Sequence, residues 1–148
     1  MTITGMEAAK KFCTASKWTL SNLELQKMLY ITHVVYFGRH KAVLLEDCFY
    51  AWDYGPVLPN VYKKLKIYGA DPVGNIFKQY NDLDKKALES QIIEEAYTNL
   101  KHLTPAQLVA LTHVKNGAWE QTYTKCPYTK INDELILQEY ENEYHGKT

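Results

Sequence analysis

The alternation of apolar and polar residues along the chain predicts several amphipathic helices and one short extended segment. Apolar residues recur at helical spacing from Met6 to Ser16, and from Leu23 to Phe37 they cover most of the helix circumference. A helix that is apolar on nearly every side is buried on nearly every side. We therefore expect residues 23–37 to form the central helix of the fold.

Capping signals indicate where two helices begin. Ser21 followed by Glu24 has the spacing of a capping box, in which the hydroxyl accepts from the third amide and the carboxylate reaches back. Thr104 and Gln107 repeat this spacing, with a proline at the first helical position. We expect the second of these helices to extend to Asn116–Gly117.

Single residues mark the remaining helices. Pro59 is suited to the first position of a helix that ends at Gly69, and Asn132 can cap the last helix of the chain. Asn81 can cap a long helix whose apolar stripe extends to Leu100.

Two stretches between the helices are expected to be non-helical. Residues 71–80 contain turn-forming residues, and Ile76 and Phe77 would anchor them to the core. Residues 48–52 are rich in aromatic side chains, which favour a short strand. Tyr54–Pro59 predicts a rigid turn, because each proline fixes its own φ and lacks an N–H.

Length and composition fit a small globular protein. The chain has 148 residues, of which 46% are hydrophobic and 23% charged, so one hydrophobic core in one domain is expected. The sequence thus predicts a mainly α fold, a single compact helical domain over residues 1–148 with a short strand or hairpin. We expect residues 145–148 to form a frayed tail.

The charge balance does not favour nucleic acid as a direct partner. Lysine and arginine total 17, as do aspartate and glutamate, and Arg39 is the only arginine. The three cysteines lack the spacing of a disulfide or zinc framework. Because no apolar stretch has membrane-spanning length and the start lacks a signal-peptide pattern, we expect a cytoplasmic protein without membrane contact.

No familiar catalytic, phosphate-binding or metal-binding motif is present in the sequence, so no cofactor and no metal are expected. Two catalytic alternatives stay open. In one, His113 is approached in space by Cys48 or Cys126. In the other, Asp53 and Glu120 form a carboxylate pair.

Structural roles are the simpler interpretation of the other titratable residues. His33 lies in the middle of the most apolar helix, where we expect a core histidine with satisfied hydrogen bonds. Two charge clusters are interpreted as solvated faces. They are Lys63, Lys64 and Lys66 after the proline turn, and Glu139, Glu141 and Glu143 on the last helix.

Four segments, in order along the chain, resemble one protein family. Asn22–Tyr30 resembles the N-x-x-L-Q-K-L-L-Y helix start, and Ala51–Tyr62 resembles the A-W-x-Y-G-P-V-x-P-x-V-Y motif, of Panacea-domain (SocA-like) antitoxins, which include phage-associated GepA-like proteins. The similarity continues at Tyr68–Gly69 and at Leu111–His113, followed by Trp119. Here the tryptophan follows Gly-Ala, whereas the family usually has a proline before it.

The resemblance implies an antitoxin of a bacterial or prophage toxin–antitoxin system. Such a protein binds and neutralises a cognate protein toxin, encoded by an adjacent gene, and is not an enzyme. An alternative that the family also implies is a proteolytic adaptor that delivers a partner to a protease. A second alternative is a small enzyme with a site made of a histidine and an acid. Homo-oligomers are compatible with each of these functions.

Two sets of residues follow from the motifs. The aromatic residues around the Gly-Pro turn offer rigid anchors of low conformational entropy for a protein partner. Alternatively, Trp52 and Tyr54 are core residues that fix the corner between strand and helix. The candidate partner-binding residues are Trp52, Asp53, Tyr54, Pro56, Val57, Tyr62 and Lys63. The residues expected to support the fold or the turn are Gln26, Lys27, Tyr30, Gly55, Pro59, His113 and Trp119. For Gln26 and Lys27 we expect contacts to the backbone of the Gly-Pro turn, or positions lining a shallow pocket.

Overall fold

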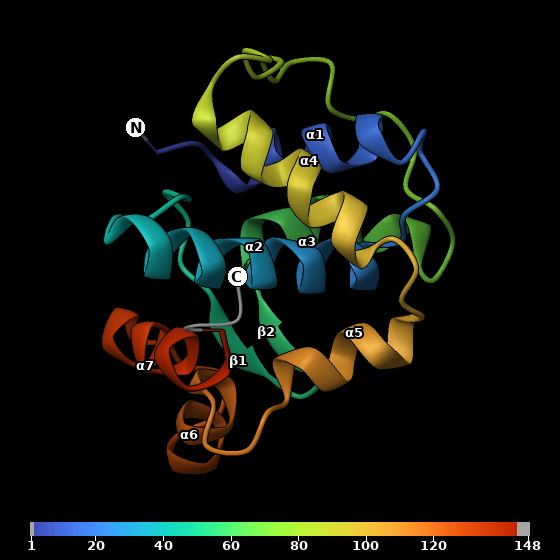
Figure 1. The fold of residues 1–148 in the computed structure, drawn as a ribbon. Coiled ribbons are helices and arrows are strands. Elements are labelled where there is room, and N and C mark those ends of the chain that lie inside the picture. Colours follow the sequence, from blue (N-terminus) through green and yellow to red (C-terminus); the bar gives the residue numbers. More distant parts are fainter. Residues whose placement is uncertain (1, 145–148) are drawn as a thin grey trace.

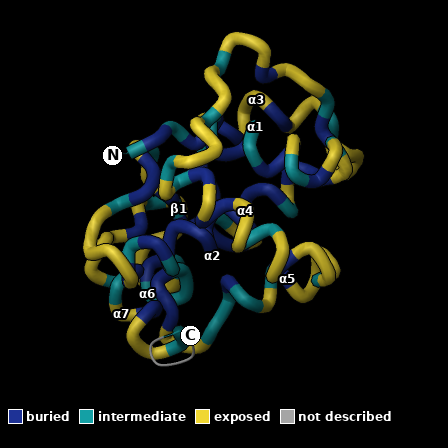
Figure 2. Tube along the Cα trace, turned by 45° about the horizontal axis from the view of Figure 1, so that its top comes forward, coloured by how far each residue is buried: buried dark blue, intermediate teal, exposed yellow. Residues whose placement is uncertain are grey.

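One long central helix, α2 (Asn22–His40), organises the structure, which is a computed structural model describing residues 2–144. Thirteen of its residues are buried, and Figure 2 shows this buried stretch in the middle of the molecule. The expected central helix is therefore confirmed. The expected frayed tail, 145–148, lies outside the described residues.

The other helices form layers on two sides of α2 (Figure 1). On one side lie α1 (Gly5–Ala15) and α4 (Leu88–Leu100), which also contact each other. On the opposite side lie α5 (Pro105–Thr112) and α7 (Asp133–Glu143). The mainly α fold predicted from the sequence is confirmed. No helix within the described residues is long and apolar enough to cross a membrane.

Capping boxes fix the starts of α2 and α5 as predicted. At α2 the Glu24 N–H donates to the Ser21 hydroxyl at 3.2 Å, and the Ser21 N–H donates to the Glu24 carboxylate at 3.0 Å. At α5 the Gln107 N–H donates to the Thr104 hydroxyl at 3.2 Å. These bonds satisfy amide groups that the first turn of a helix leaves without intrahelical partners.

The small β element is an antiparallel hairpin. Strand β1 (Tyr50–Trp52) pairs with β2 (Gly55–Val57), so that Tyr50 lies opposite Val57 and Trp52 opposite Gly55. The hairpin leads into α3 (Pro59–Leu65), with Pro59 at its first turn as predicted, and then into the 3-10 helix η1 (Lys66–Tyr68).

The prediction of a turn throughout 54–59 was therefore wrong for Gly55–Val57, which forms a strand despite containing Pro56. Pro56 is opposite Ala51. Ala51 directs its own N–H to the Thr129 carbonyl and accepts from the Tyr128 N–H, at 2.9 and 2.7 Å. Both backbone groups of Ala51 are therefore bonded elsewhere, and no hydrogen bond is lost because Pro56 has no N–H.

The predicted helix start at Asn81 was wrong, because α4 begins only at Leu88. Asp84 competes with helix formation: its carboxylate accepts from the Lys86 N–H and its carbonyl from the Ala87 N–H. The Lys10 ammonium also holds this segment by pairing with Asp82 at 3.0 Å.

Within the preceding segment, Phe77 is fully buried and anchors the chain as predicted. Ile76 is 36% exposed and does not, so that part of the prediction was wrong.

The region after α5 also departs from expectation. Helix α5 ends at Thr112 instead of Asn116–Gly117, and a separate helix, α6 (Ala118–Lys125), follows. Asn116 has a positive φ of 60°, which interrupts the helical path.

Glu139 was expected on a solvated face, and this was wrong, because the residue is only 2% exposed. Its carboxylate accepts from the Tyr30 hydroxyl and from the Ala118 N–H, both at 2.9 Å. Burial raises the pKa of Glu139 and, together with the carboxylate, that of Tyr30. The acid therefore connects the first amide of α6 to the core of α2.

His33 is a core histidine, as predicted, but not a fully satisfied one. It lies against Phe37 and Phe49, and among the described residues its Nδ1 has no hydrogen-bond partner. Burial lowers the pKa of His33 to about 4.

Candidate functional site

A hollow of about 410 Å³ lies between the start of α2, the β hairpin and α3, and we call it the hairpin hollow. Helix α2, the start of η1 and the residue after η1 contribute Asn22, Leu23, Gln26, Lys27, Lys66 and Gly69. The hairpin, α3 and the segment before α7 contribute Trp52, Asp53, Tyr54, Val57, Tyr62 and Tyr128.

Two polar residues of α2 hold the second half of the hairpin by its backbone. The Gln26 side-chain oxygen accepts from the Leu58 N–H at 2.8 Å, and the Lys27 ammonium donates to the Pro56 carbonyl at 3.3 Å. Both side chains are only 2% exposed. They contact the Gly-Pro turn and also line the hollow, so both expectations stated for them are confirmed.

Trp119 holds the first half of the hairpin. Its indole N–H donates to the Trp52 carbonyl at 2.7 Å, so the polar group of this ring is satisfied. The ring stacks between His113, with centroids 4.0 Å apart and planes 6° apart, and Tyr123, at 4.9 Å and 19°. Helix α6 thereby fixes strand β1 through an aromatic stack and one backbone hydrogen bond.

Two tyrosines hold Asp53 in the turn of the hairpin. The Tyr123 hydroxyl donates to its carboxylate at 2.5 Å, and hydrogen bonds from Tyr123 and Tyr128 lower the pKa of Asp53. The hydrogen bond between Tyr128 and Asp53 raises the pKa of Tyr128 to about 12. The acid is therefore engaged with phenol groups and keeps its negative charge.

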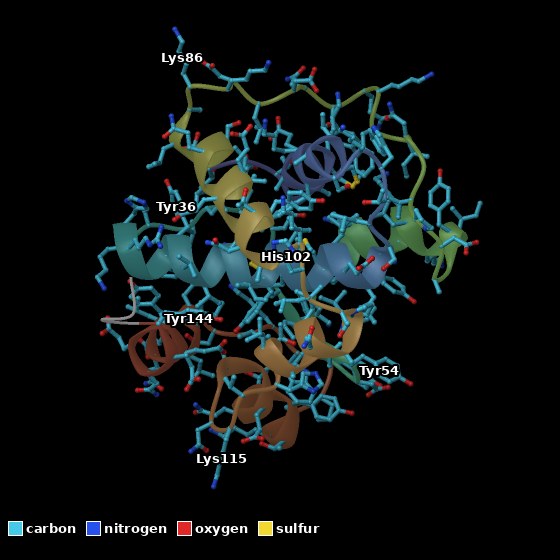
Figure 3. The ribbon with its side chains drawn as sticks, turned by 45° about the vertical axis from the view of Figure 1, so that its right-hand side comes forward. Tyr36, Tyr54, Lys86, His102, Lys115 and Tyr144 are labelled. Atoms are coloured by element: carbon cyan, nitrogen blue, oxygen red, sulfur yellow. The ribbon has the colours of Figure 1, made fainter. Side chains whose placement is uncertain are left out.

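The rim of the hollow is aromatic and accessible. Tyr54 is 77% exposed at the turn, and Figure 3 shows it projecting away from the body of the molecule. Tyr62 is 37% exposed and meets Trp52 edge to face, with ring centroids 5.2 Å apart. Large rings on a fixed backbone lose little conformational freedom on binding, which is typical of interface anchors.

The structure brings most of the predicted partner-binding residues together. Trp52, Asp53, Tyr54, Val57 and Tyr62 line the hairpin hollow.

Two predicted contact residues and one supporting residue lie elsewhere. Lys63 lines a neighbouring hollow that shares Trp52 and Tyr128 with the first. Pro56 is buried and takes part through its carbonyl. Tyr30 is fully buried, where it donates to Glu139, and does not reach the site.

Several lining residues were missed from the sequence. Leu23 is 38% exposed, because it occupies the outward side of the first turn of α2. Tyr128 is 55% exposed and arrives from a distant part of the chain, beside Ala51. The capping box could have pointed to Leu23, since it places the helix start, but no local pattern marks Tyr128.

The residues of the two catalytic alternatives are engaged with different partners. Glu120 accepts from the Asn116 N–H at 2.9 Å, whereas Asp53 binds Tyr123. Cys48 and Cys126 are exposed and line hollows to which His113 does not contribute. Among the described residues, no group of three or more His, Cys, Asp or Glu side chains could hold a metal ion.

His113 lies at the back of the hairpin. Burial lowers its pKa, the positive charge of Lys27 lowers it further, and the Tyr54 backbone opposes both effects. Its Nε2 is buried without a described hydrogen-bond partner.

The sequence of the part that fixes the aromatic Gly-Pro hairpin against the central helix matches a known class of domain. The family described as "Antitoxin SocA-like, Panacea domain" matches residues 25–120, and this chain belongs to it. The resemblance drawn from the motifs is thus confirmed. The matched range includes α2 from Leu25 onward, the hairpin, α3 and Trp119.

A particular relative is Antitoxin SocA of Caulobacter vibrioides (strain NA1000 / CB15N). It is 29% identical over 110 residues, which cover 68% of this chain and 58% of the relative. The chain therefore matches less than two thirds of the length of this relative. No solved structure matches the chain.

Proposed function

We propose that this protein is an antitoxin that binds and neutralises a cognate protein toxin, and that the hairpin hollow is its contact surface. Membership of the antitoxin family supports the antitoxin role. The observation that carries the choice of surface is the exposed aromatic rim on a hairpin held from behind by α2 and α6. A rigid, partly apolar surface of this kind suits recognition of another protein.

Three polar groups around the hollow hold the hairpin in place, which supports a rigid binding surface more than a catalytic site. Gln26 and Trp119 are bonded to hairpin backbone, and Asp53 is bonded to tyrosine hydroxyls. We place the protein in the cytoplasm beside a toxin encoded by a neighbouring gene, because antitoxins have to meet their toxins as these are made.

The test is co-expression of the neighbouring gene product with and without this protein, scored by growth and then by co-purification. We expect growth arrest by the neighbour and relief of the arrest through a stable complex. A harmless neighbour that forms no complex would remove the antitoxin proposal.

The contact surface is tested separately with Tyr54→Ala. Removing the most exposed ring of the rim should weaken the complex by 10-fold or more, as expected for an aromatic anchor. The matched control is Leu88→Ala, which removes a 44% exposed apolar side chain at the start of α4. If both variants bind within 2-fold of the wild type, the toxin contacts another face.

The adaptor alternative differs in what happens to the toxin. Occlusion leaves the half-life of the toxin unchanged or longer in the presence of this protein. Delivery to a protease shortens it. A pulse-chase measurement on the same co-expression strain distinguishes the two.

A further inference from the structure

Among the described residues, the Lys27 ammonium is a buried charge without a counter-ion. The residue is 2% exposed, and the hydrogen-bond acceptor found for it there is the Pro56 carbonyl at 3.3 Å. The ion pairs among the described residues involve other cations, namely Lys10, Lys11, Arg39 and Lys41. An ammonium has three N–H donors, so a single long bond leaves most of its capacity unused.

Further polar atoms converge beside Lys27 on the backbone of Gly55, whose φ is +117°. A side chain starting there would place its first carbon 2.8 Å from the Lys27 Nζ and 2.9 Å from the His113 Nε2. The same point lies 3.2 Å from the Thr112 hydroxyl oxygen. The absence of a side chain at Gly55 thus lets the buried cation and a histidine nitrogen that has no described partner lie close to its backbone.

The charges around the hollow favour an anion. Lys66 adds a second, exposed cation to the lining. Asp53 is the acidic residue among those that line the hollow, and its carboxylate is engaged by Tyr123 and Tyr128. Among the described residues Asp53 forms no ion pair with Lys27, so two cations of the lining face one acid.

A purely structural role does not require a charge at this position. Gln26, one residue earlier, already holds the hairpin with a 2.8 Å bond to the Leu58 N–H, and it does so without a buried charge. Burying an ammonium is costly unless a partner charge compensates for it. Burial accordingly lowers the pKa of Lys27 to about 8, which still leaves most of the side chain charged at neutral pH.

We propose that the hairpin hollow receives an aspartate or glutamate side chain of the toxin, which forms an ion pair with the Lys27 ammonium. This inference rests on the proposed function and specifies the chemistry of the partner. The aromatic rim would surround the ion pair and exclude water from it, which strengthens the attraction between the charges.

The first test compares Lys27→Met, which keeps the volume of the side chain but removes its charge, with Lys64→Met. Lys64 is exposed on α3 and does not line the hollow, so it controls for the loss of one positive charge. We expect Lys27→Met to weaken the complex with the neighbouring gene product by about 30-fold or more, and Lys64→Met by less than 2-fold.

Stability of the free protein separates an ion-pairing role from a structural one. If Lys27 waits for a partner charge, Lys27→Met has an unchanged or higher urea midpoint and still loses affinity. If Lys27 only clamps the Pro56 carbonyl, the variant unfolds at lower urea and binds the toxin within 2-fold of the wild type, which overturns the proposal.

The partner carboxylate is identified by replacing each aspartate and glutamate of the toxin with its amide. One replacement should weaken binding to the wild type and have no further effect on binding to Lys27→Met. If none of the amide replacements in the toxin behaves in this way, the inference is contradicted.

A measurement on the wild-type protein alone remains decisive if Lys27→Met does not fold. Sodium formate, with sodium chloride at equal ionic strength as control, is titrated while NMR follows the Lys27 ε-methylene and His113 ring signals. A saturable shift specific to formate supports a carboxylate site, and the absence of one overturns it.

A wild type that forms no complex overturns the proposed function, whereas a complex unaffected by Lys27→Met overturns only this inference.

Discussion

His33 is a titratable residue of α2 that lies in the apolar core, against the rings of Phe37 and Phe49. It is 3% exposed, and burial lowers its pKa from 6.5 to about 4. The folded protein therefore binds this proton less tightly than the unfolded chain does. The contribution of neutral His33 to stability is fully present above about pH 6.5 and is lost as the pH falls toward 4.

The expected loss from His33 is about 3 kcal/mol of unfolding free energy between pH 7 and pH 4. Urea unfolding of the wild type at several pH values in this window should show it. His33→Leu should have a flatter pH dependence, because the variant has no proton to bind at this site. His102→Asn, which removes an exposed histidine, is the control and should keep the wild-type loss. Parallel curves for wild type and His33→Leu would contradict the assignment.

At the residue scale, the sequence predicted polar groups whose surroundings are otherwise apolar. Gln26 and Lys27 interrupt an apolar helix, so contacts to the backbone of the Gly-Pro turn could be expected, and they are found. Glu139 could not be placed in this way, because it stands beside Glu141 and Glu143 in a cluster that resembles a solvated face. Its partners, Tyr30 and the first amide of α6, are set by the tertiary fold.

The contact between α2 and α7 depends on the absence of a side chain at Gly38. A Cβ at this position would lie 2.0 Å from the ring of Tyr140, so the helices approach as closely as they do only because of the glycine. Glycine in a helix costs up to about 1 kcal/mol relative to alanine, and here the packing offsets that cost.

Gly38→Ala should therefore destabilise the protein by about 2 kcal/mol, although alanine is the better helix former. In a Tyr140→Ala background the clash is absent, and the same substitution should become neutral or stabilising. Urea denaturation of the two single variants and the double variant measures this change of sign. A Gly38→Ala protein more stable than the wild type would show that α7 does not pack against this position.

At the element scale, two helix starts with a capping box were predicted, although the box of Thr4 and Glu7 at α1 was missed. Elements that depend on distant partners could not be predicted. The boxes at Ser21 and Thr104 are local and hold in the structure. Helix α6 follows a residue with positive φ, and its first amide is satisfied by Glu139 of α7. Strand β2 includes a proline that is tolerated because Ala51 bonds to the segment around Tyr128. Both cases require the tertiary fold.

The whole molecule is assembled on one helix. Helix α2 contacts α1 and α4 on one side, α5 and α7 on the other, and α3 and β2 at the hairpin. Because every layer shares this element, no layer can lose its packing without exposing part of α2.

We therefore predict a single cooperative unfolding transition, as expected of one domain over the described residues. The three tryptophans report on different regions: Trp18 follows α1, Trp52 lies in the hairpin and Trp119 in α6. Urea midpoints from circular dichroism at 222 nm and from tryptophan fluorescence should coincide. Two separate midpoints would show that the layers unfold independently.

At this scale the fold class and the location of the hollow were predictable from the sequence, because the aromatic Gly-Pro motif is contiguous. The composition of its floor and rim was not. Lys66 follows from the path of α3 and η1, whereas Tyr128 is brought in by backbone bonds to Ala51. The neighbouring position of His113 and Lys27 also depends on how α5 packs against the hairpin.

Three of the bonds that hold the hairpin end on its backbone: at the Leu58 N–H, the Pro56 carbonyl and the Trp52 carbonyl. Replacing the side chains of Tyr54 or Tyr62 therefore leaves these three bonds in place. Mutations on the rim can accumulate during evolution without first requiring compensation in the core. Selection for a new partner and selection for a folded protein would then act on different atoms of the same hairpin, which makes this rim a suitable place to randomise when recognition is to be redirected.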